Sequence, residues 1–198
     1  MELRSSETKI NLLRAFAGES QARNRYTFAA TVAKKAGAAA LADIFLYTAG
    51  QEKEHAEIFY RHLSPFGGES ISIDAAYPID DAASLATLLR ASEKNEYEEH
   101  RDIYPAFAKK AEEEGFPAIA ASFRMIAKIE ESHGERFARF AALAENAALF
   151  TSPTECAWVC LNCGHIHEGK SAPAICPVCQ HDQGYFLRLA DAPYTARS

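Results

Sequence analysis

Four segments of this chain carry apolar residues at alternating spacings of four and three, and polar side chains interrupt each apolar stripe near its middle. A 4-3 repeat lies on one face of an α-helix, so four such segments predict a left-handed four-helix bundle with the stripes inside. The stripes are Leu12, Phe16, Glu19, Arg23, Tyr26, Ala30 and Ala33; Leu41, Phe45, Thr48, Glu52, His55, Phe59 and His62; Leu85, Leu89, Ser92, Glu96, Glu99, Ile103 and Ala106; and Ile119, Phe123, Ile126, Glu130, His133, Phe137 and Phe140.

Gly and Pro residues set the expected helix boundaries. Helical composition covers 5–36, 38–63, 82–113 and 117–148. Residues 64–80 contain two Pro and two Gly and have no helical period, so we expect a long crossover there. Asp80 or Asp81 can cap the third helix. Pro105 should kink that helix, because proline lacks a backbone N–H.

The polar groups inside the stripes are mainly carboxylates and imidazoles at matching depth. A carboxylate that is buried without a partner costs several kcal/mol, so five of them at one level require a strong cation. The alternative is a displaced register that turns the glutamates to solvent. That alternative would have to hold in all four helices at the same depth, which argues against it.

The sequence also repeats itself across the bundle. Glu52-x-x-His55 and Glu130-x-x-His133 are the same motif 78 residues apart, and Glu19 and Glu96 are 77 residues apart. Residues i and i+3 share a helix face, so each motif can offer both groups to one metal pair. Two such motifs plus one Glu from each remaining helix form the ligand set of di-iron carboxylate bundles.

Charge balance agrees with two divalent ions. Glu19, Glu52, Glu96 and Glu130 bring four negative charges against the four positive charges of two Fe(II). Glu99 lies one turn after Glu96 and is an additional carboxylate for a more oxidised pair. Imidazole and carboxylate ligands suit iron or manganese, whereas zinc would supply no redox chemistry.

All five cysteines follow residue 155, which divides the chain into an expected bundle at 1–150 and a small module at 151–198, joined by the turn-rich segment 151–155. Cys160-x-x-Cys163 and Cys176-x-x-Cys179 predict a tetrahedral four-thiolate metal site. A module of this size cannot bury a sufficient core, so we expect the metal to hold its fold. Cys156 is expected to be a free thiol.

Composition excludes several classes of protein. The net charge of −6 and the pI of about 5.7 disfavour a nucleic-acid partner. No apolar run approaches the roughly 20 residues of a membrane helix, and the first residues do not resemble a signal peptide. We therefore expect a cytoplasmic protein, in which clustered cysteines bind metal.

These motifs resemble the rubrerythrin family over essentially the whole chain. The resemblance rests on AGES (17–20), QEKEH (51–55), EYEEHRDIYPAFAKKAEEEG (96–115), IEESH (129–133) and the two cysteine motifs. It implies an all-α ferritin-like four-helix bundle with a di-iron site, followed by a rubredoxin-like iron domain. Two departures are Gln180, where such knuckles often have Gly, and Asp182, where relatives often have Pro.

The resemblance also implies residue roles. The di-iron ligands would be Glu19, Glu52, His55, Glu96, Glu99, Glu130 and His133, and the rubredoxin-like iron would bind Cys160, Cys163, Cys176 and Cys179. One iron would exchange Glu99 for His55 on reduction. Tyr26 and Tyr104 would stand beside the ligands, and Tyr26 can donate a hydrogen bond to a bound oxygen species.

The implied activity is that of a non-haem di-iron peroxidase that reduces hydrogen peroxide to water. Electrons would come from an NAD(P)H-dependent reductase or a rubredoxin-type carrier, and the chains would pair head to tail as a homodimer. Two alternatives remain open at this point. One is a ferroxidase or iron-handling protein that uses the same bundle, and the other is a zinc ribbon in place of the four-cysteine iron site.

Overall fold

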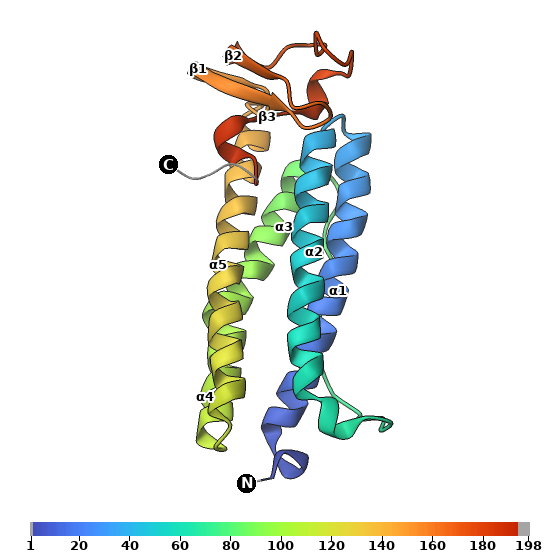
Figure 1. The fold of residues 1–198 in the computed structure, drawn as a ribbon, viewed down its shortest axis with the longest axis vertical. Coiled ribbons are helices and arrows are strands. Elements are labelled where there is room, and N and C mark those ends of the chain that lie inside the picture. The colour runs from blue at the N-terminus through green and yellow to red at the C-terminus, as the bar shows by residue number, and fades with distance from the viewer. Residues whose placement is uncertain (1, 194–198) are drawn as a thin grey trace.

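The computed structural model describes residues 2–193 and consists of a long helical bundle with a small β-rich unit at one end (Figure 1). The long helices are α1 (Glu7–Lys35), α2 (Ala39–His62) and α5 (Pro117–Glu145). The fourth position of the bundle is filled by α3 (Leu85–Glu98), a π-helical segment η3 (Glu99–Ile103) and α4 (Tyr104–Glu113), which follow one another without a break. The predicted ferritin-like four-helix bundle with a long crossover is confirmed.

The π-helical segment accounts for an error in the predicted third stripe. A π-turn carries one extra residue, so the residues after it are rotated relative to a regular α-helix. Ala106 is therefore exposed, while Tyr104, Ala108 and Ala111 are buried in its place. The predicted kink at Pro105 stays a prediction; what the structure shows near it is this π-turn, which ends at Ile103, and a new α-helix that begins at Tyr104.

Two other details of the predicted helices are wrong. Arg23 lies on the first stripe but is exposed, because a straight helix with 3.6 residues per turn drifts away from a seven-residue repeat and Ala22 takes the inward position. The cap of α3 is Ser84, whose hydroxyl accepts the N–H of Thr87. Neither predicted aspartate caps the helix, since Asp80 instead pairs with Arg25.

The crossover between α2 and α3 begins with η2 (Ser64–Phe66) and then runs along α1 as an irregular segment. The Tyr77 hydroxyl donates to the carbonyl of Arg14 at 2.8 Å, and the Arg14 guanidinium donates to the carbonyl of Asp74 at 3.1 Å. Arg25 binds Asp80 through both carboxylate oxygens at 2.9 Å. These contacts fasten the crossover against the bundle.

The interior of the bundle has two apolar clusters with a polar layer between them. One cluster contains Phe45, Leu89 and Phe137, and the other contains Leu12, Phe59 and Phe123. All six side chains are fully or almost fully buried. The mid-stripe glutamates and histidines lie between the clusters, so apolar packing on both sides excludes water from the polar layer.

The cysteine module contains a three-stranded antiparallel sheet in the order β2-β1-β3, formed by β1 (Thr151–Cys160), β2 (Ile166–Ser171) and β3 (Phe186–Arg188). The prediction that 151–155 is only a linker is wrong, because these residues begin β1. Pro153 is tolerated there because the β1–β2 register is irregular between Thr151 and Cys156 and β3 pairs only with the far end of β1.

The module packs on the end of the bundle where α1 turns into α2 and where α5 ends (Figure 1). Leu187 joins the bundle cluster that contains Phe45, and Arg139 of α5 forms an ion pair with Asp191. A Cβ atom at Gly184 would collide with the carbonyl oxygen of Gly37, so only glycine permits this close approach.

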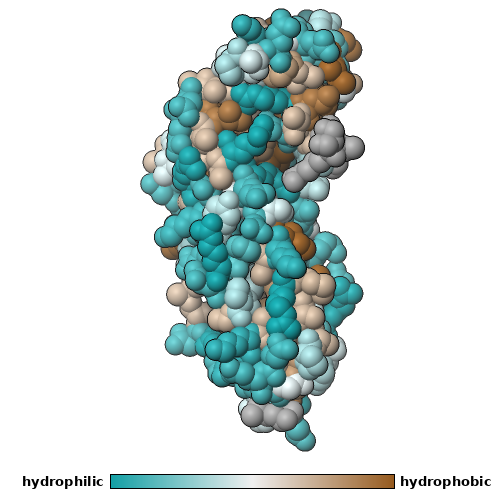
Figure 2. Space-filling view, turned by 90° about the vertical axis from the view of Figure 1, so that its left-hand side faces the viewer, coloured by the Kyte–Doolittle hydropathy of each residue, from teal (hydrophilic) through white to brown (hydrophobic). Residues whose placement is uncertain are grey.

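The face of the molecule shown in Figure 2 is mainly hydrophilic, with apolar side chains gathered toward the end that carries the module. Across residues 2–193, none of the helices combines the length and the apolar character that a bilayer span demands.

Candidate metal centre

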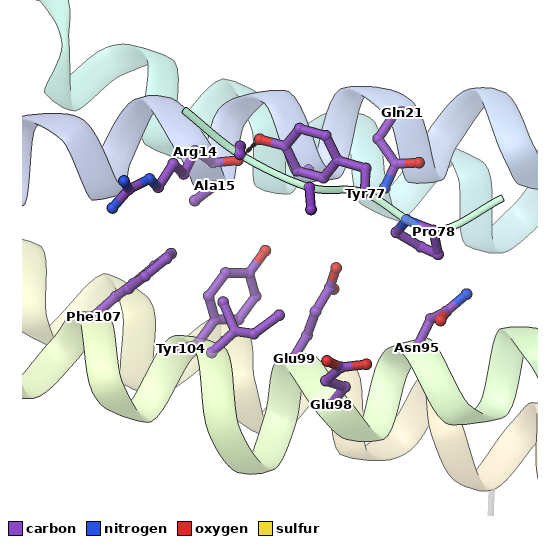
Figure 3. Close-up of a pocket in the computed structure, with 14 residues that line it drawn as sticks. Arg14, Ala15, Gln21, Tyr77, Pro78, Asn95, Glu98, Glu99, Tyr104 and Phe107 are labelled. Carbon is purple, nitrogen blue, oxygen red and sulfur yellow. Dashed lines mark hydrogen bonds between the residues drawn. The ribbon is translucent and has the colours of Figure 1, made fainter. Parts of the chain in front are cut away.

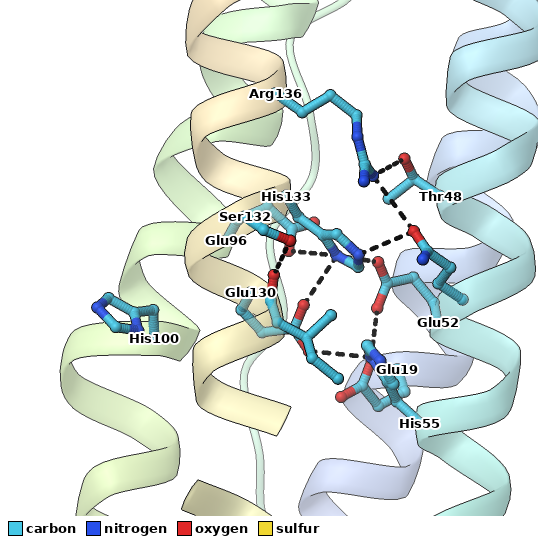
Figure 4. Close-up of polar contacts among 12 residues, drawn as sticks. Glu19, Thr48, Glu52, His55, Glu96, His100, Glu130, Ser132, His133 and Arg136 are labelled. Carbon is cyan, nitrogen blue, oxygen red and sulfur yellow. Dashed lines mark hydrogen bonds and ion pairs between the residues drawn. The ribbon is translucent and has the colours of Figure 1, made fainter. Parts of the chain in front are cut away.

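Four helices bring six of the predicted ligands into one buried polar layer (Figure 4). Their donor atoms form two groups, each with all atoms within 4.8 Å of one another. The first group is Glu19, Glu52, His55 and Glu130, and the second is Glu52, Glu96, Glu130 and His133. Glu52 and Glu130 belong to both groups, which is the arrangement that two bridging carboxylates would give.

The two histidines occupy equivalent positions on either side of these shared carboxylates. Nδ1 of His55 lies 3.2 Å from Glu52 and 3.0 Å from Glu130, and Nδ1 of His133 lies 2.9 Å from each. The imidazole rings are nearly parallel, with centroids 5.7 Å apart. Each half of the layer thus offers one imidazole, one carboxylate of its own and two shared carboxylates.

The polar layer is not satisfied by protein hydrogen bonds alone. Within residues 2–193, no hydrogen bond of good geometry reaches six ligand-type atoms, namely Glu19 Oε2, Glu52 Oε1, Glu96 Oε2, both carboxylate oxygens of Glu130 and His133 Nδ1. Buried polar atoms are normally paired, so orphaned donor atoms that converge on two points fit bound cations. The donor set suits iron, and the residues present fit a di-iron site.

The pKa shifts of the ligand groups also fit a site that binds cations. Burial raises the pKa of Glu19 to about 8, and burial also raises the pKa of Glu96. Burial opposes the charged form of His55 and His133, yet the surrounding carboxylates raise the pKa of both imidazoles. Without metal, protons are shared among these groups, and bound divalent ions would replace those protons.

Two buried tyrosines complete the pseudo-symmetry of the layer. The Tyr26 hydroxyl donates to Oε1 of Glu96, and the Tyr104 hydroxyl donates to Oε1 of Glu19. Glu19 and Glu96 are the two carboxylates that are not shared between the ligand groups. Each tyrosine therefore binds the unshared carboxylate of the other half of the repeat. Burial, followed by the nearby carboxylates, raises the pKa of both phenols, so they remain neutral donors.

The π-turn explains why the repeat offset changes along the chain. Glu19 and Tyr26 are seven residues apart, whereas their counterparts Glu96 and Tyr104 are eight residues apart. The extra residue lies in the π-helical segment Glu99–Ile103. This segment restores the tyrosine to its equivalent position.

Glu99 lines a pocket beside the ligand layer and is not part of either ligand group. Figure 3 shows its carboxylate pointing from the third helix into a space that α1 and the crossover close on the opposite side. The pocket has a volume of about 350 Å³, and Tyr104, Tyr77 and Arg14 are among its lining residues. Burial, followed by the neighbouring glutamates, raises the pKa of Glu99.

The four predicted cysteine ligands also converge. Their sulfur atoms all lie within 4.8 Å of one another, and the Sγ pairs Cys160–Cys179 and Cys163–Cys176 are each 3.7 Å apart. That separation is far longer than a disulfide bond of about 2.05 Å. It matches the edge of a tetrahedron with metal–sulfur bonds of about 2.3 Å. The cysteines are free thiols in a geometry that fits one tetrahedral metal ion.

The two cysteine knuckles have the same backbone geometry. Gly164 N–H donates to the carbonyl of Cys160 at 2.8 Å, and Gln180 N–H donates to the carbonyl of Cys176 at 3.0 Å. Gly164 has a φ of +78° and Gln180 has a φ of +61°. Gln180 therefore adopts the conformation that glycine adopts in the first knuckle. Asp182 caps the following turn, since its Oδ1 accepts the N–H of Gly184 at 2.9 Å.

Gln51, which no sequence motif singled out, contacts the metal layer without being one of its predicted ligands. Its Oε1 lies 3.1 Å from Nε2 of His133. Gln51 directly precedes Glu52, and this adjacency was the only signal in the sequence. The contact crosses from α2 to α5, so the helix pattern alone could not reveal it.

The fold and the two donor sets define a class of protein: a ferritin-like bundle with a di-iron carboxylate site, joined to a four-cysteine rubredoxin-like module. Comparison with known families agrees with this class. The rubrerythrin family model matches residues 11–141, and the model of the rubrerythrin rubredoxin-like domain matches residues 158–187. The chain belongs to the rubrerythrin family.

Relatives cover nearly the whole chain. Rubrerythrin of Porphyromonas gingivalis is 49% identical over 93% of this chain and 90% of its own length. Rubrerythrin of Clostridium perfringens is 45% identical over 93% of this chain and 95% of its own length. A solved structure of fully reduced nigerythrin is similar with a TM-score of 0.62 and 28% identity, over 93% of this chain and 87% of that one.

Proposed function

We propose that this protein is a non-haem di-iron peroxidase that reduces hydrogen peroxide to water. The observation that carries the proposal is the combination, in one chain, of a two-metal donor layer beside a pocket and a four-cysteine site attached to the end of the same bundle. Peroxide reduction needs two electrons and two protons for each pair of water molecules formed. The bound iron pair would supply both electrons, and the cysteine site would return them one at a time.

The residues of the chain would hold the site and admit the substrate. The pocket beside Glu99 lies between the third helix and the crossover, and it would give peroxide a route to the ligand layer from that side (Figure 3). The Tyr104 hydroxyl lines this pocket while it holds Glu19, and the Tyr26 hydroxyl holds Glu96 from the other half. The apolar clusters above and below keep bulk water away from the layer.

The likeness to rubrerythrins supports further parts of the proposal. Electrons would reach the cysteine site from an NAD(P)H-dependent reductase or a rubredoxin-type carrier. The chains would act as a head-to-tail homodimer in the cytoplasm as part of the defence against peroxide. All eleven predicted metal ligands, with Tyr26 and Tyr104, are proposed as the residues of the two centres.

An anaerobic turnover assay tests the activity. The iron-loaded protein is supplied with NADPH and a reductase that reduces rubredoxins, and consumption of NADPH is followed after addition of either hydrogen peroxide or oxygen. We expect turnover with peroxide that is clearly faster than turnover with oxygen. A ferroxidase would instead oxidise added Fe(II) with oxygen and retain more than two ferric ions per bundle, and that result would overturn the proposal.

A further inference from the structure

The two histidines of the metal layer are equivalent in the internal repeat but differ in the surroundings of their outer ring nitrogens. His55 and His133 are equivalent in the repeat and contact the same shared carboxylates. Their outer ring nitrogens have different surroundings. Nε2 of His133 lies 3.1 Å from Oε1 of Gln51, whereas no side chain or carbonyl within residues 2–193 hydrogen-bonds Nε2 of His55, whose contacts are made by Nδ1.

The His133 contact is the end of a chain of hydrogen bonds between α2 and α5. The Thr48 hydroxyl donates to the carbonyl of Ile44 at 3.0 Å and accepts from Nη1 of Arg136 at 2.9 Å. The same Nη1 donates to Oε1 of Gln51 at 3.3 Å. Figure 4 shows Arg136 reaching across to Thr48 above the His133 ring.

This series of hydrogen bonds determines which tautomer a neutral His133 ring adopts. Arginine is only a donor, so the atom of Gln51 that faces Arg136 must be the amide oxygen. An amide oxygen only accepts, so Nε2 of His133 must be the donor in the contact with Gln51. The lone pair of a neutral His133 ring is then on Nδ1, which is the nitrogen that faces the carboxylates.

The repeat shows that the other half lacks these residues. A shift of 78 residues relates Gln51 to Ile129, Thr48 to Ile126 and Arg136 to Ile58. Isoleucine offers no hydrogen-bond partner from its side chain. The acceptor, the cation and the hydroxyl that hold His133 are therefore all replaced by hydrocarbon at the positions equivalent to them around His55.

We propose that Gln51, held by Arg136, is a positioning residue that fixes the ring orientation and the tautomer of His133, a hold that the isoleucines at the equivalent positions do not provide for His55. Partners of this kind orient metal-bound histidines and set their tautomer, and their loss typically lowers metal affinity by about 10–100-fold. The proposal rests on the di-iron site proposed above but not on peroxide as the substrate.

The test is an anaerobic titration of the metal-free full-length protein with Co(II), in which two binding steps in the bundle are separated from the cysteine site by their spectra. Gln51→Met keeps the length of the side chain and removes the acceptor. We expect this variant to lose about 10–100-fold in affinity at one of the two bundle sites and to keep the affinity of the other. Gln51→Glu retains an acceptor beside Arg136 and should restore most of the loss.

Proton NMR of the Co(II)-loaded protein measures the exchange of the Nε2–H protons of the bound histidines. A general loss of stability would not single out the proton of one histidine. A histidine bound through Nδ1 shows a shifted Nε2–H signal that exchanges with water. In the wild type we expect one such signal to exchange slowly and one to exchange rapidly, and in Gln51→Met both should exchange rapidly. Arg136→Met leaves Gln51 itself intact. In this variant the slowly exchanging signal should exchange faster than in the wild type, but more slowly than in Gln51→Met.

Two results would overturn the proposal. One is wild-type affinity at both bundle sites in Gln51→Met together with an unchanged slow signal. The other is an equal loss at both sites that Gln51→Glu does not rescue, since this would indicate general damage to the bundle. Failure of peroxide turnover in the wild type would affect only the proposed function, because none of these measurements uses peroxide.

Discussion

At the scale of single residues, most of the candidate site was visible in the sequence because its chemistry is unusual for a helix interior. Glutamates and histidines on otherwise apolar stripes demand a cation, and the structure brings six of the seven predicted ligands into two overlapping groups. Glu99 lies apart from them, at the pocket. The hydrogen bond from His133 to Gln51 could not be predicted, because it depends on the rotation of two helices relative to each other.

Tyr26 offers a conservative test of the hydroxyl groups in the layer. Tyr26→Phe keeps the aromatic contacts with Phe45 and Phe137 and removes only the donor to Glu96. We expect peroxide reduction to slow by about ten-fold, as for one lost hydrogen bond of roughly 1–1.5 kcal/mol. Tyr60→Phe removes the hydroxyl of an exposed tyrosine outside the layer and is the control. A wild-type rate in Tyr26→Phe would show that Tyr26 only fills the core.

Gln180 offers a test of backbone strain in the second knuckle. A non-glycine residue in the left-handed region costs about 1–2 kcal/mol. Gln180→Gly should stabilise the metal-loaded module by about 0.5–1 kcal/mol, because glycine removes the strain but loses more backbone entropy on folding. Gly164→Gln, at the matching position with a φ of +78°, should destabilise it. Bleaching of the iron-site colour in guanidinium chloride measures both, and faster bleaching of Gln180→Gly would contradict the account.

At the scale of elements, helix number, order and facing were predictable, whereas local irregularities were not. The stripes of α2 and α5 are buried over almost their whole length because a heptad pattern reports directly on burial. The π-turn between α3 and α4 left only an indirect trace, the change of repeat offset from 77 to 78, which does not say where the extra residue lies. Residues 151–155 resemble a linker in composition, but tertiary pairing makes them part of β1.

Glu99 lines the pocket beside the ligand layer, and this position leads to a prediction about the oxidised state. The six other ligands already form two complete groups, so Glu99→Gln should still bind two ferrous ions in the bundle. Its turnover with peroxide should be slow, since the additional negative charge is then missing when the charge of the metal pair rises. Glu98→Gln, an exposed neighbour that also lines the pocket, is the matched control. Loss of ferrous binding in Glu99→Gln would assign Glu99 to the reduced site instead.

At the scale of the whole molecule, the module and the di-iron layer are far apart along the bundle. The module packs where α2 begins, and Glu52 lies 13 residues after Ala39, which corresponds to about 20 Å of helix at 1.5 Å per residue. A head-to-tail partner would bring the module of one chain near the layer of the other. We therefore expect electrons to cross between chains.

Mixed dimers of two inactive variants test this route. Glu52→Ala lacks the bundle site and Cys160→Ser lacks the relay, so each homodimer should be inactive with a reductase as donor. After refolding together, mixed dimers contain one intact bundle facing one intact cysteine site on the partner chain, and activity should return. Mixed dimers that form but stay inactive would show that electrons move within one chain.

We propose above that the buried layer is a two-metal centre that delivers two electrons to peroxide. The most direct measurement is a single-turnover experiment on the fully reduced protein with one equivalent of hydrogen peroxide, followed by stopped-flow absorbance and freeze-quench Mössbauer spectroscopy. We expect two of the three ferrous ions per chain to be oxidised in one fast phase, with the peroxide fully consumed. Oxidation of the cysteine site alone, or of a single bundle iron per peroxide, would contradict the account.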